Sequence, residues 1–294
     1  MDKEQMAIAR LQDAAKLSLH RFKKPLRVTY SGGKDSQVLL ALAERAGIDF
    51  EVINSHTTAD APETVYFIRQ QFHELELRGG GRCKIIKPVY KGKPVSMWTL
   101  IPQKLTPPTR LMRYCCQILK EANGKGFFNA TGVRWAESPR RKNSRGVMEV
   151  MNKDPKKRII LTNDNDEKRN LFETCNLKAE MVVNPIIDWS DDDVWEYIES
   201  EKLPYNPLYC EGWKRVGCIG CPLAGGKMMQ KEFARWPKYQ EMYIAAFDRM
   251  LQVRKDRGKE AVAWKTGVDV FHWWIGDGVV SGQIGMEELL EDDK

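Results

Sequence analysis

The feature that most constrains the fold is a glycine loop between a β-prone run and a helical run. Residues 26–30 (LRVTY) are β-prone, residues 31–36 read Ser-Gly-Gly-Lys-Asp-Ser, and residues 37–46 have the apolar spacing of a helix. Gly47 ends that helix, and residues 50–54 (FEVIN) predict a second strand. Two strands joined through a helix form a βαβ unit with parallel strands. The sequence therefore predicts an α/β fold with a doubly wound, mostly parallel sheet.

Between this unit and residue 230, two further strands, two helices and two irregular segments are expected. Residues 63–75 predict a helix, residues 84–89 and 127–133 predict strands, and Ser190 is the expected N-cap of a helix that opens with acidic residues. Four prolines in the segment 92–110 predict a long functional loop. The polar, strongly charged stretch 136–169 predicts a second irregular region.

The loop at residues 31–36 is suited to binding an anion. Its glycines allow close backbone approach, and its amide N–H groups and the helix N-terminus present partial positive charge. We expect Lys34 to neutralise phosphate oxygens and Asp35 to orient the loop or hold Mg²⁺. The spacing differs from the Walker loop, which has four residues between its first glycine and Gly-Lys-Ser/Thr. The expected phosphate-binding residues are Ser31, Gly32, Gly33, Lys34, Asp35 and Ser36.

Three motifs, in order, resemble those of one enzyme family. The loop resembles the PP-loop of ATP pyrophosphatases and their sulfur-assimilation relatives. Residues 132–141 (GVRWAESPRR) resemble the Gly-x-Arg-x-x-Glu-Ser-x-x-Arg motif of the phosphoadenosine phosphosulfate (PAPS) reductase family. Residues 184–189 and 193–195 are similar to the stretch before that family's second cysteine pair. The resemblance implies an adenine nucleotide alpha-hydrolase-like fold. It also implies nucleotide-binding roles for Arg134, Glu137 and Arg140, and catalytic roles for Lys34, Asp35 and Arg134.

Four of the seven cysteines form two close pairs that lie far apart in the sequence. Cys115 and Cys116 are adjacent, and Cys218 and Cys221 form a Cys-x-x-Cys pair. Such pairs suit an iron–sulfur cluster, and zinc would accept the same ligands. The arrangement resembles that of the cluster-bearing adenylyl sulfate reductases, which implies a four-iron four-sulfur (4Fe-4S) cluster held by all four thiolates.

The other three cysteines leave alternatives open. Cys210 could replace Cys218 as the fourth ligand, and Cys175 is a weaker candidate. Cys83 is expected to be a structural thiol.

The expected domains follow from these motifs. Residues 1–230 are predicted to form the PP-loop nucleotide-binding domain with the iron–sulfur site. Residues 231–294, which include a predicted helix at 231–257, are expected to form a helical C-terminal extension packed on it.

The sequence differs from the reductases of the family in two ways. They attack the sulfonucleotide with a cysteine near the C-terminus, and no cysteine follows Cys221 here. The glycine loop is also closer to that of ATP-using members, which include the ATP pyrophosphatase of DNA phosphorothioation. We therefore expect an enzyme that binds ATP and Mg²⁺, transfers adenylate and releases pyrophosphate in sulfur metabolism or sulfur transfer. A sulfonucleotide reductase that forms sulfite, and a nucleotide-binding accessory protein with a structural cluster, are the alternatives.

Composition bounds the environment and the partners. Hydrophobic residues make up 42% of the chain and charged residues 30%, and no run approaches the ~18 apolar residues of a membrane helix. Without an evident secretion signal, we expect a soluble, cytoplasmic protein with reduced thiols. The net charge of +7 is concentrated in basic runs at residues 140–142 and 156–158, so nucleic acid is one candidate partner. A sulfur donor or thiol carrier protein and a homo-oligomeric state are also expected.

Overall fold

The computed structural model describes most of the chain and divides it into two compact units. The described residues are 2–122, 124, 126–152, 154–169, 172, 180–259 and 263–276. Cys175 lies outside them. The sheet unit consists of residues 1–55, 62–86 and 123–216, and the helical unit consists of residues 56–61, 87–122 and 217–294. The domain boundary at residue 230 stays a prediction, because a unit of packing need not be a domain that folds alone.

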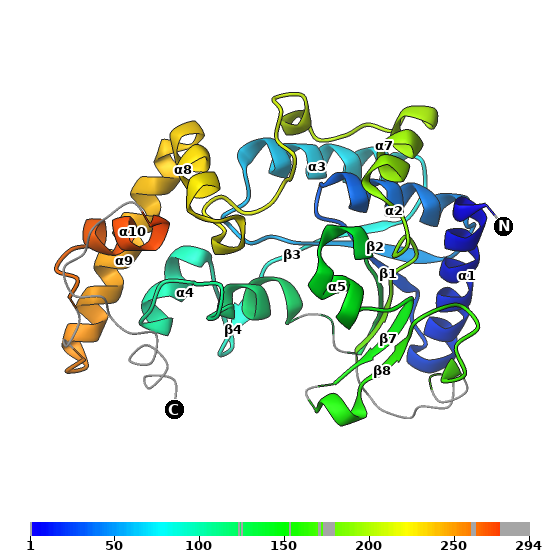
Figure 1. The fold of residues 1–294 in the computed structure, drawn as a ribbon, viewed down its shortest axis with the longest axis horizontal. Helices are drawn as coiled ribbons and strands as arrows, with labels where there is room; N and C mark the ends of the chain where they lie inside the picture. The colour runs from blue at the N-terminus through cyan, green and yellow to red at the C-terminus, as the bar shows by residue number, and fades with distance from the viewer. Residues whose placement is uncertain are drawn as a thin grey trace. The chain divides into compact units, whose positions relative to one another are not determined.

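The sheet unit is built on a seven-stranded sheet with the order β3-β2-β1-β6-β9-β7-β8 (Figure 1). The first five strands in this order run parallel, and β7 and β8 are antiparallel. The predicted mostly parallel α/β sheet is therefore confirmed. The strands are β1 Leu26–Thr29, β2 Phe50–Ser55, β3 Arg82–Ile86, β6 Phe128–Ala130, β7 Met148–Met151, β8 Ile159–Leu161 and β9 Glu180–Val183.

In the sheet unit α1 precedes β1, and the other α-helices follow strands β1, β2, β6 and β9 along the chain. The α-helices are α1 Lys3–Phe22, α2 Lys34–Arg45, α3 Pro62–Leu77, α5 Pro139–Ser144 and α7 Asp191–Ser200. Short 3₁₀ turns are η2 Trp135–Glu137, η3 Pro155–Lys157 and η4 Pro207–Tyr209. Successive strands add to one side of β1 through β2 and β3 and to the other side through β6 and β9. The order in which strands are added therefore reverses at β1. Open α/β sheets bind ligands beside such a reversal, at the carboxyl ends of the strands.

Two segments expected to be irregular contain regular structure. Residues 136–169 hold α5 and the antiparallel pair β7–β8, which extends the sheet at one edge. Met148, Val150 and Leu161 are buried there, so the strands follow an apolar pattern that the surrounding charges obscure in the sequence. In the segment 92–110, α4 (Met97–Lys104) starts at a Ser96 capping box.

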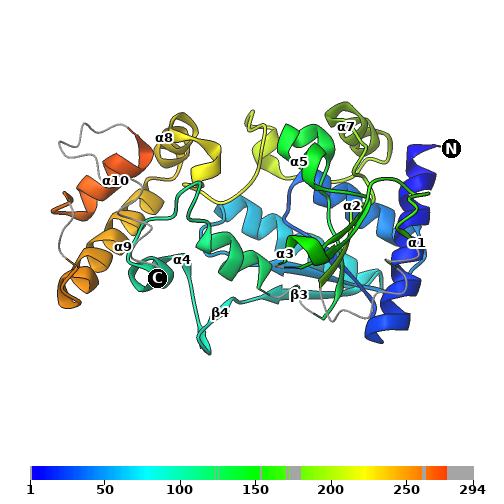
Figure 2. The same cartoon turned by 60° about the horizontal axis from the view of Figure 1, so that its bottom comes forward.

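The helical unit packs around aromatic side chains. Its helices α8 (Gly226–Arg235), α9 (Pro237–Asp256) and α10 (Gly267–Ile275) confirm that the C-terminal part is helical, and α9 contacts α10 and α4 (Figure 2). The single helix predicted at 231–257 is in fact two, because α8 ends at Arg235 and Pro237 starts α9. The remaining elements are a π-helical turn η1 (Cys116–Glu121), a 3₁₀ turn η5 (Pro222–Ala224) and the hairpin β4 Val89–Tyr90 with β5 Lys93–Pro94. The buried aromatic core includes Phe233, Tyr243, Phe247, Phe271 and Trp274. Among the described residues, no helix is both long and apolar enough to cross a membrane.

A buried carboxylate holds the β7–β8 edge to the rest of the sheet. Glu149 on β7 is fully buried, and it accepts hydrogen bonds from Arg158 at 2.8 Å and from Asn184 at 3.0 Å. Arg145 Nε lies 3.0 Å from Glu149 Oε1. The charge of one carboxylate is thus balanced by two guanidinium groups, and removing it would leave both cations without their common partner.

We expect Glu149→Ala to lower the free energy of unfolding by about 3–5 kcal/mol, because it breaks a buried ion pair on one side only. Urea unfolding measures this change. The matched control is Glu167→Ala on the exposed surface of the same unit, which should change stability by less than about 0.5 kcal/mol. Equal effects of the two substitutions would contradict a stabilising role for Glu149.

Candidate functional site

The glycine loop lies between β1 and α2, and its backbone requires glycine. Gly32 has φ = +73°, and a Cβ at this position would lie 2.9 Å from Ile68 Cγ1 and 3.1 Å from Thr64 Cγ2. Gly33 is the N-cap of α2 and provides no side-chain acceptor for the first amide groups of that helix. The N-terminus of α2 is therefore not capped by the N-cap residue, as in an anion-binding turn, although Lys34 N donates to the Tyr209 hydroxyl at 3.0 Å.

The side-chain hydroxyls of the two loop serines, Ser31 and Ser36, are hydrogen-bonded to each other. The Ser36 hydroxyl donates to Gly33 O at 2.8 Å and accepts from Ser31 N at 3.2 Å, and the two hydroxyl oxygens lie 3.3 Å apart. Ser36 is buried and fixes the turn, whereas Ser31 is exposed. Of the two hydroxyls, the one on Ser31 is thus better placed to bond to a ligand.

Four charged side chains converge at the start of α2. Lys34 Nζ lies 2.6 Å from Asp191 Oδ1 and 3.3 Å from Asp35 Oδ1. Arg134 Nε donates to Asp35 Oδ1 at 2.7 Å, and its Nη2 donates to Asp191 Oδ1 at 2.8 Å. The two cations are nearly buried, with side-chain exposures of 7% and 3%, whereas the Asp191 side chain is 62% exposed. Lys34, Asp35 and Arg134, which the sequence singled out, therefore meet at one point.

The loop after β6 holds Arg134 in place. The Arg134 amide donates to Glu137 Oε1 at 3.0 Å, and its guanidinium donates to Trp189 O at 3.3 Å. A Cβ at Gly132 would lie 3.0 Å from the Asp35 carbonyl, so the two loops touch through their backbones. Glu137 thus positions Arg134 rather than contributing to the group of four charges.

Arg140, the third residue expected from this motif, is exposed on α5. In the part of the chain that the structure describes, no hydrogen bond or ion pair joins Arg140 to the glycine loop. Its contact with a nucleotide stays a prediction.

Three residues that complete the site were missed in the sequence. Asp191 reads there as a helix-opening acid, and Tyr209 and Asn206 stand in a segment with no motif. Lys34 N donates to the Tyr209 hydroxyl at 3.0 Å, and burial raises the pKa of Tyr209 to about 12. Asn206 is buried and donates to Gly32 O at 3.2 Å. In the sequence, Asn206 and Tyr209 are marked only by their position shortly after the 184–195 motif.

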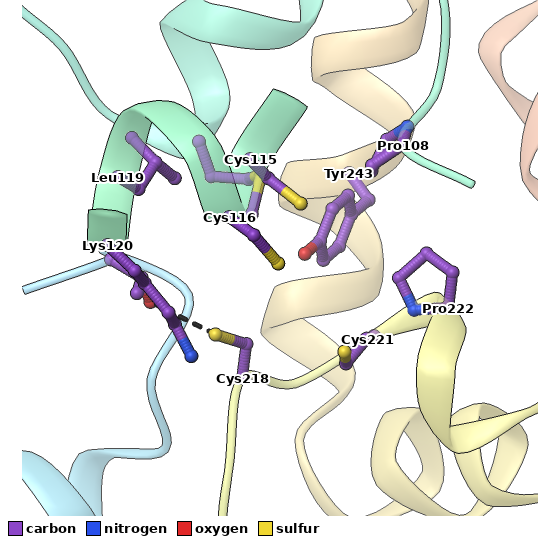
Figure 3. Close-up of a pocket in the computed structure, with 12 residues that line it drawn as sticks. Pro108, Cys115, Cys116, Leu119, Lys120, Cys218, Cys221, Pro222 and Tyr243 are labelled. Atoms are coloured by element: carbon purple, nitrogen blue, oxygen red, sulfur yellow. Dashed lines mark hydrogen bonds between the residues drawn. The ribbon is translucent and has the colours of Figure 1, made fainter. Parts of the chain in front are cut away.

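A second candidate site lies in the helical unit, where four cysteines line one pocket (Figure 3). Cys115 and Cys116 come from the start of η1, and Cys218 and Cys221 come from the loop before η5. The hydroxyl of Tyr243 on α9 also borders this pocket, where it donates to the backbone of that loop at 3.0 Å. All four cysteines that line the pocket are free thiols. Within the described residues, no three His, Cys, Asp or Glu side chains are grouped closely enough to hold a single metal ion.

Gly220 shapes the turn between the second pair of cysteines. Its φ is +70°, and a Cβ there would lie 2.7 Å from Phe233 and 3.0 Å from both Trp274 and Tyr243. The Gly220 amide donates to Glu232 Oε2 at 2.7 Å. The aromatic core therefore fixes the direction in which this pair of thiols points.

Cationic side chains border the thiols. Hydrogen bonds from Cys115 and, at 3.6 Å, from Arg113 together lower the pKa of the Cys116 thiol to about 5, against the effect of burial. Burial raises the pKa of the Cys218 thiol, whose sulfur lies 3.4 Å from the Thr57 hydroxyl, and the electrostatic interaction with Cys218 raises the pKa of Lys120. Cations beside thiols favour the thiolate form, which is the form that binds metals.

The other cysteines lie elsewhere. Cys210 is exposed in the sheet unit, where its sulfur lies 3.9 Å from the Tyr205 hydroxyl, and it is not among the residues that line the pocket. Cys83 is half-buried on β3, and burial raises the pKa of its thiol to about 11. Of the alternatives left open by the sequence, the geometry favours Cys218 over Cys210 as the partner of the other three thiols.

Comparison with known proteins gives one family match and several relatives that are similar over most of this chain. The family model for the phosphoadenosine phosphosulfate reductase domain matches residues 25–224. An adenosine 5'-phosphosulfate reductase of Staphylococcus haemolyticus is 26% identical over 219 residues, which cover 72% of this chain and 76% of that protein. An uncharacterized protein of Methanocaldococcus jannaschii is 31% identical over 241 residues, which cover 77% of this chain and 43% of that protein. The chain spans about half the length of this relative.

Two solved structures are similar to the chain at low scores. A phosphoadenylyl-sulfate reductase from Candida auris has a TM-score of 0.41 and 18% identity, with 70% of this chain and 87% of that chain covered. The U34-tRNA thiolase NcsA from Methanococcus maripaludis, solved with its [4Fe-4S] cluster, has a TM-score of 0.43 and 14% identity, with 86% and 81% covered.

The crowding around Gly32 gives a test of the loop. Alanine at Gly32 and at Gly47 incurs the same left-handed backbone strain, roughly 1 kcal/mol, but only Gly32 has side chains in the way, since nothing lies within 4 Å of a Cβ at Gly47. We expect Gly32→Ala to cost about 1–3 kcal/mol more stability than Gly47→Ala, measured by chemical unfolding. Equal losses would mean that the loop does not pack against α3 as described.

Proposed function

The chain belongs to the phosphoadenosine phosphosulfate reductase family, and on that premise we propose that it is an ATP pyrophosphatase that carries a 4Fe-4S cluster. The matched residues 25–224 include the glycine loop, the 132–141 motif and both cysteine pairs. An acceptor oxygen attacks the α-phosphorus of ATP, the bond to the β-phosphate oxygen breaks, and pyrophosphate leaves. The products are an adenylylated acceptor and pyrophosphate, and sulfur then displaces the adenylate.

The observation that carries this proposal is the pair of nearly buried cations at the N-terminus of α2. Lys34 and Arg134 both reach Asp35 and Asp191, at a helix start whose N-cap residue, Gly33, supplies no side-chain acceptor. A lysine, an arginine and a helix N-terminus together can neutralise the oxygens of a polyphosphate and the charge that develops on leaving pyrophosphate. Asp35 is the candidate ligand for Mg²⁺, which would add to this charge stabilisation.

The choice of ATP over a sulfonucleotide rests on the loop itself, which resembles that of ATP-using members of the family. The similarity to an adenosine 5'-phosphosulfate reductase keeps the second reaction as the alternative. The two reactions differ in product, since one releases pyrophosphate and the other releases sulfite.

The donor set of the cysteine pocket supports a cluster. Four thiols from two chain segments border one pocket, and Arg113 and Lys120 lie beside them. Four cysteine thiolates are the usual ligands of a 4Fe-4S cluster, which is larger than a single ion and so suits thiols that do not meet at one point. Cys115, Cys116, Cys218 and Cys221 would hold the cluster, which would supply a site for sulfur or electron transfer, or a structural tie.

We expect Lys34→Ala to weaken ATP binding about tenfold to a hundredfold, because hydrogen bonds to charged groups contribute about 1.5–3 kcal/mol each. Equilibrium titration with ATP measures this change, and pyrophosphate release on mixing with candidate acceptors measures the reaction. Lys16→Ala, on the exposed face of α1, is the control and should bind within about twofold of the unsubstituted protein.

Two outcomes would overturn the ATP assignment. One is equal ATP binding by the Lys34→Ala and Lys16→Ala proteins. The other is sulfite formation from adenylyl sulfate with a thiol carrier, without pyrophosphate release from ATP.

For the cluster, we expect anaerobically purified protein to contain about four irons per chain and to show the broad visible absorption of an iron–sulfur protein. Cys218→Ser should lower the iron content severalfold, because one of the four thiolates is lost. Cys83→Ser, which changes a cysteine outside the pocket, should leave the iron content unchanged. Stoichiometric zinc in place of iron would refute the cluster assignment.

A further inference from the structure

The cations that a phosphate would need are held by a carboxylate of the protein itself. A single oxygen, Asp191 Oδ1, accepts from Lys34 at 2.6 Å and from Arg134 at 2.8 Å. These distances are those of short charge-assisted hydrogen bonds. An oxygen atom with a negative charge, bound by both cations at the start of α2, occupies the chemical role of a phosphate oxygen.

We propose that Asp191 is an internal competitor of the phosphate groups and sets the affinity of the site for nucleotides. This inference rests on the proposed function, since it concerns the same anion-binding residues. A phosphate that approaches Lys34 and Arg134 must displace the Asp191 carboxylate or share the two cations with it.

Asp191 is placed so that it can be displaced at low cost. Its side chain is 62% exposed, compared with 26% for Asp35, which contacts the same two cations. Asp191 is the first residue of α7, and the capping box of that helix is made by Ser190 and Asp193 without it. Release of the carboxylate would therefore leave the start of α7 intact.

The released carboxylate would also keep a favourable environment. Asp191 lies in the first turn of α7, where the partial positive charge of the helix N-terminus stabilises acidic side chains. The contact with Lys34 and Arg134 thus adds to an existing stabilisation, and the exchange of one anion for another changes few interactions inside the protein.

The protonation state of Asp191 is compatible with this role. Partial burial alone would raise its pKa, but hydrogen bonds from Lys34 and Arg134 outweigh burial and hold the pKa below its ordinary value. The carboxylate is then charged at neutral pH, and the contact is lost only as the pH falls through the lowered pKa. The Asp191 carboxylate is therefore available to compete with phosphate at neutral pH.

A ligand-binding role for Asp191 predicts the opposite result from a competing role. A carboxylate that orients the two cations, or that binds Mg²⁺ with Asp35, makes nucleotide binding stronger. A carboxylate that competes makes it weaker. The sign of the change in affinity upon neutralising Asp191 therefore separates the two roles.

The test is calorimetric titration of Asp191→Asn with inorganic pyrophosphate in EDTA and with ATP in Mg²⁺. Because partly exposed ion pairs contribute only modestly, loss of the charge in two such contacts should tighten pyrophosphate binding roughly threefold to tenfold. Asp192→Asn is the matched control, since it removes the same charge from the exposed neighbouring position of the same turn. It should bind within about twofold of the unsubstituted protein. Circular dichroism and thermal unfolding confirm that each variant is folded, and Asp191→Ser replaces Asp191→Asn if the latter is not.

The outcomes separate this inference from the proposed function. Binding by Asp191→Asn that equals that of Asp192→Asn, or that is weaker, overturns the competitor role while leaving nucleotide binding in place. Weaker binding confined to the Mg²⁺ arm would make Asp191 a metal ligand and equally overturns it. If the unsubstituted protein and all variants bind neither pyrophosphate nor ATP, the proposed function itself fails and this inference fails with it.

Discussion

The candidate anion site depends on two nearly buried cations that share the same two carboxylates. Lys34 belongs to the helix after β1, Arg134 to the loop after β6, and Asp191 to the first turn of α7. Each of these segments follows a strand of one parallel sheet. The sheet therefore brings together charges from distant parts of the sequence, and the ion pairs offset the cost of keeping a lysine and an arginine largely out of water.

The backbone elements around this site could be predicted from the sequence, but only some of its functional side chains could. The glycine loop and the apolar runs around it predict the parallel sheet and the position of Lys34 and Asp35, because these depend on local spacing. Arg134 came from the resemblance of its motif to a family, and the family match confirms that resemblance. Asp191 and Tyr209 could not be found in this way, since their roles come from contacts between segments that only the fold brings together.

Two regions predicted to be irregular contain regular structure, one because its charged residues obscured two strands and the other because its prolines obscured a helix. The pair β7–β8 was not expected because charged residues surround its short apolar pattern, and Glu149, within β7, is buried only because Arg145, Arg158 and Asn184 accompany it. In α4, Pro102 lies inside a helix that a Ser96 capping box nevertheless starts. Both cases depend on partners that a single sequence does not reveal, whereas the two cysteine pairs, each set by a local turn, were recognisable directly.

The glycine between the second pair of cysteines links sulfur chemistry to the folding of the helical unit. Because three aromatic rings enclose Gly220, the turn can keep its shape only while those rings stay packed. A loosened interior would therefore disturb the geometry of the thiols while the surrounding helices still persisted. If the four thiols hold the proposed cluster, binding of the cluster and packing of the aromatic interior would each stabilise the other.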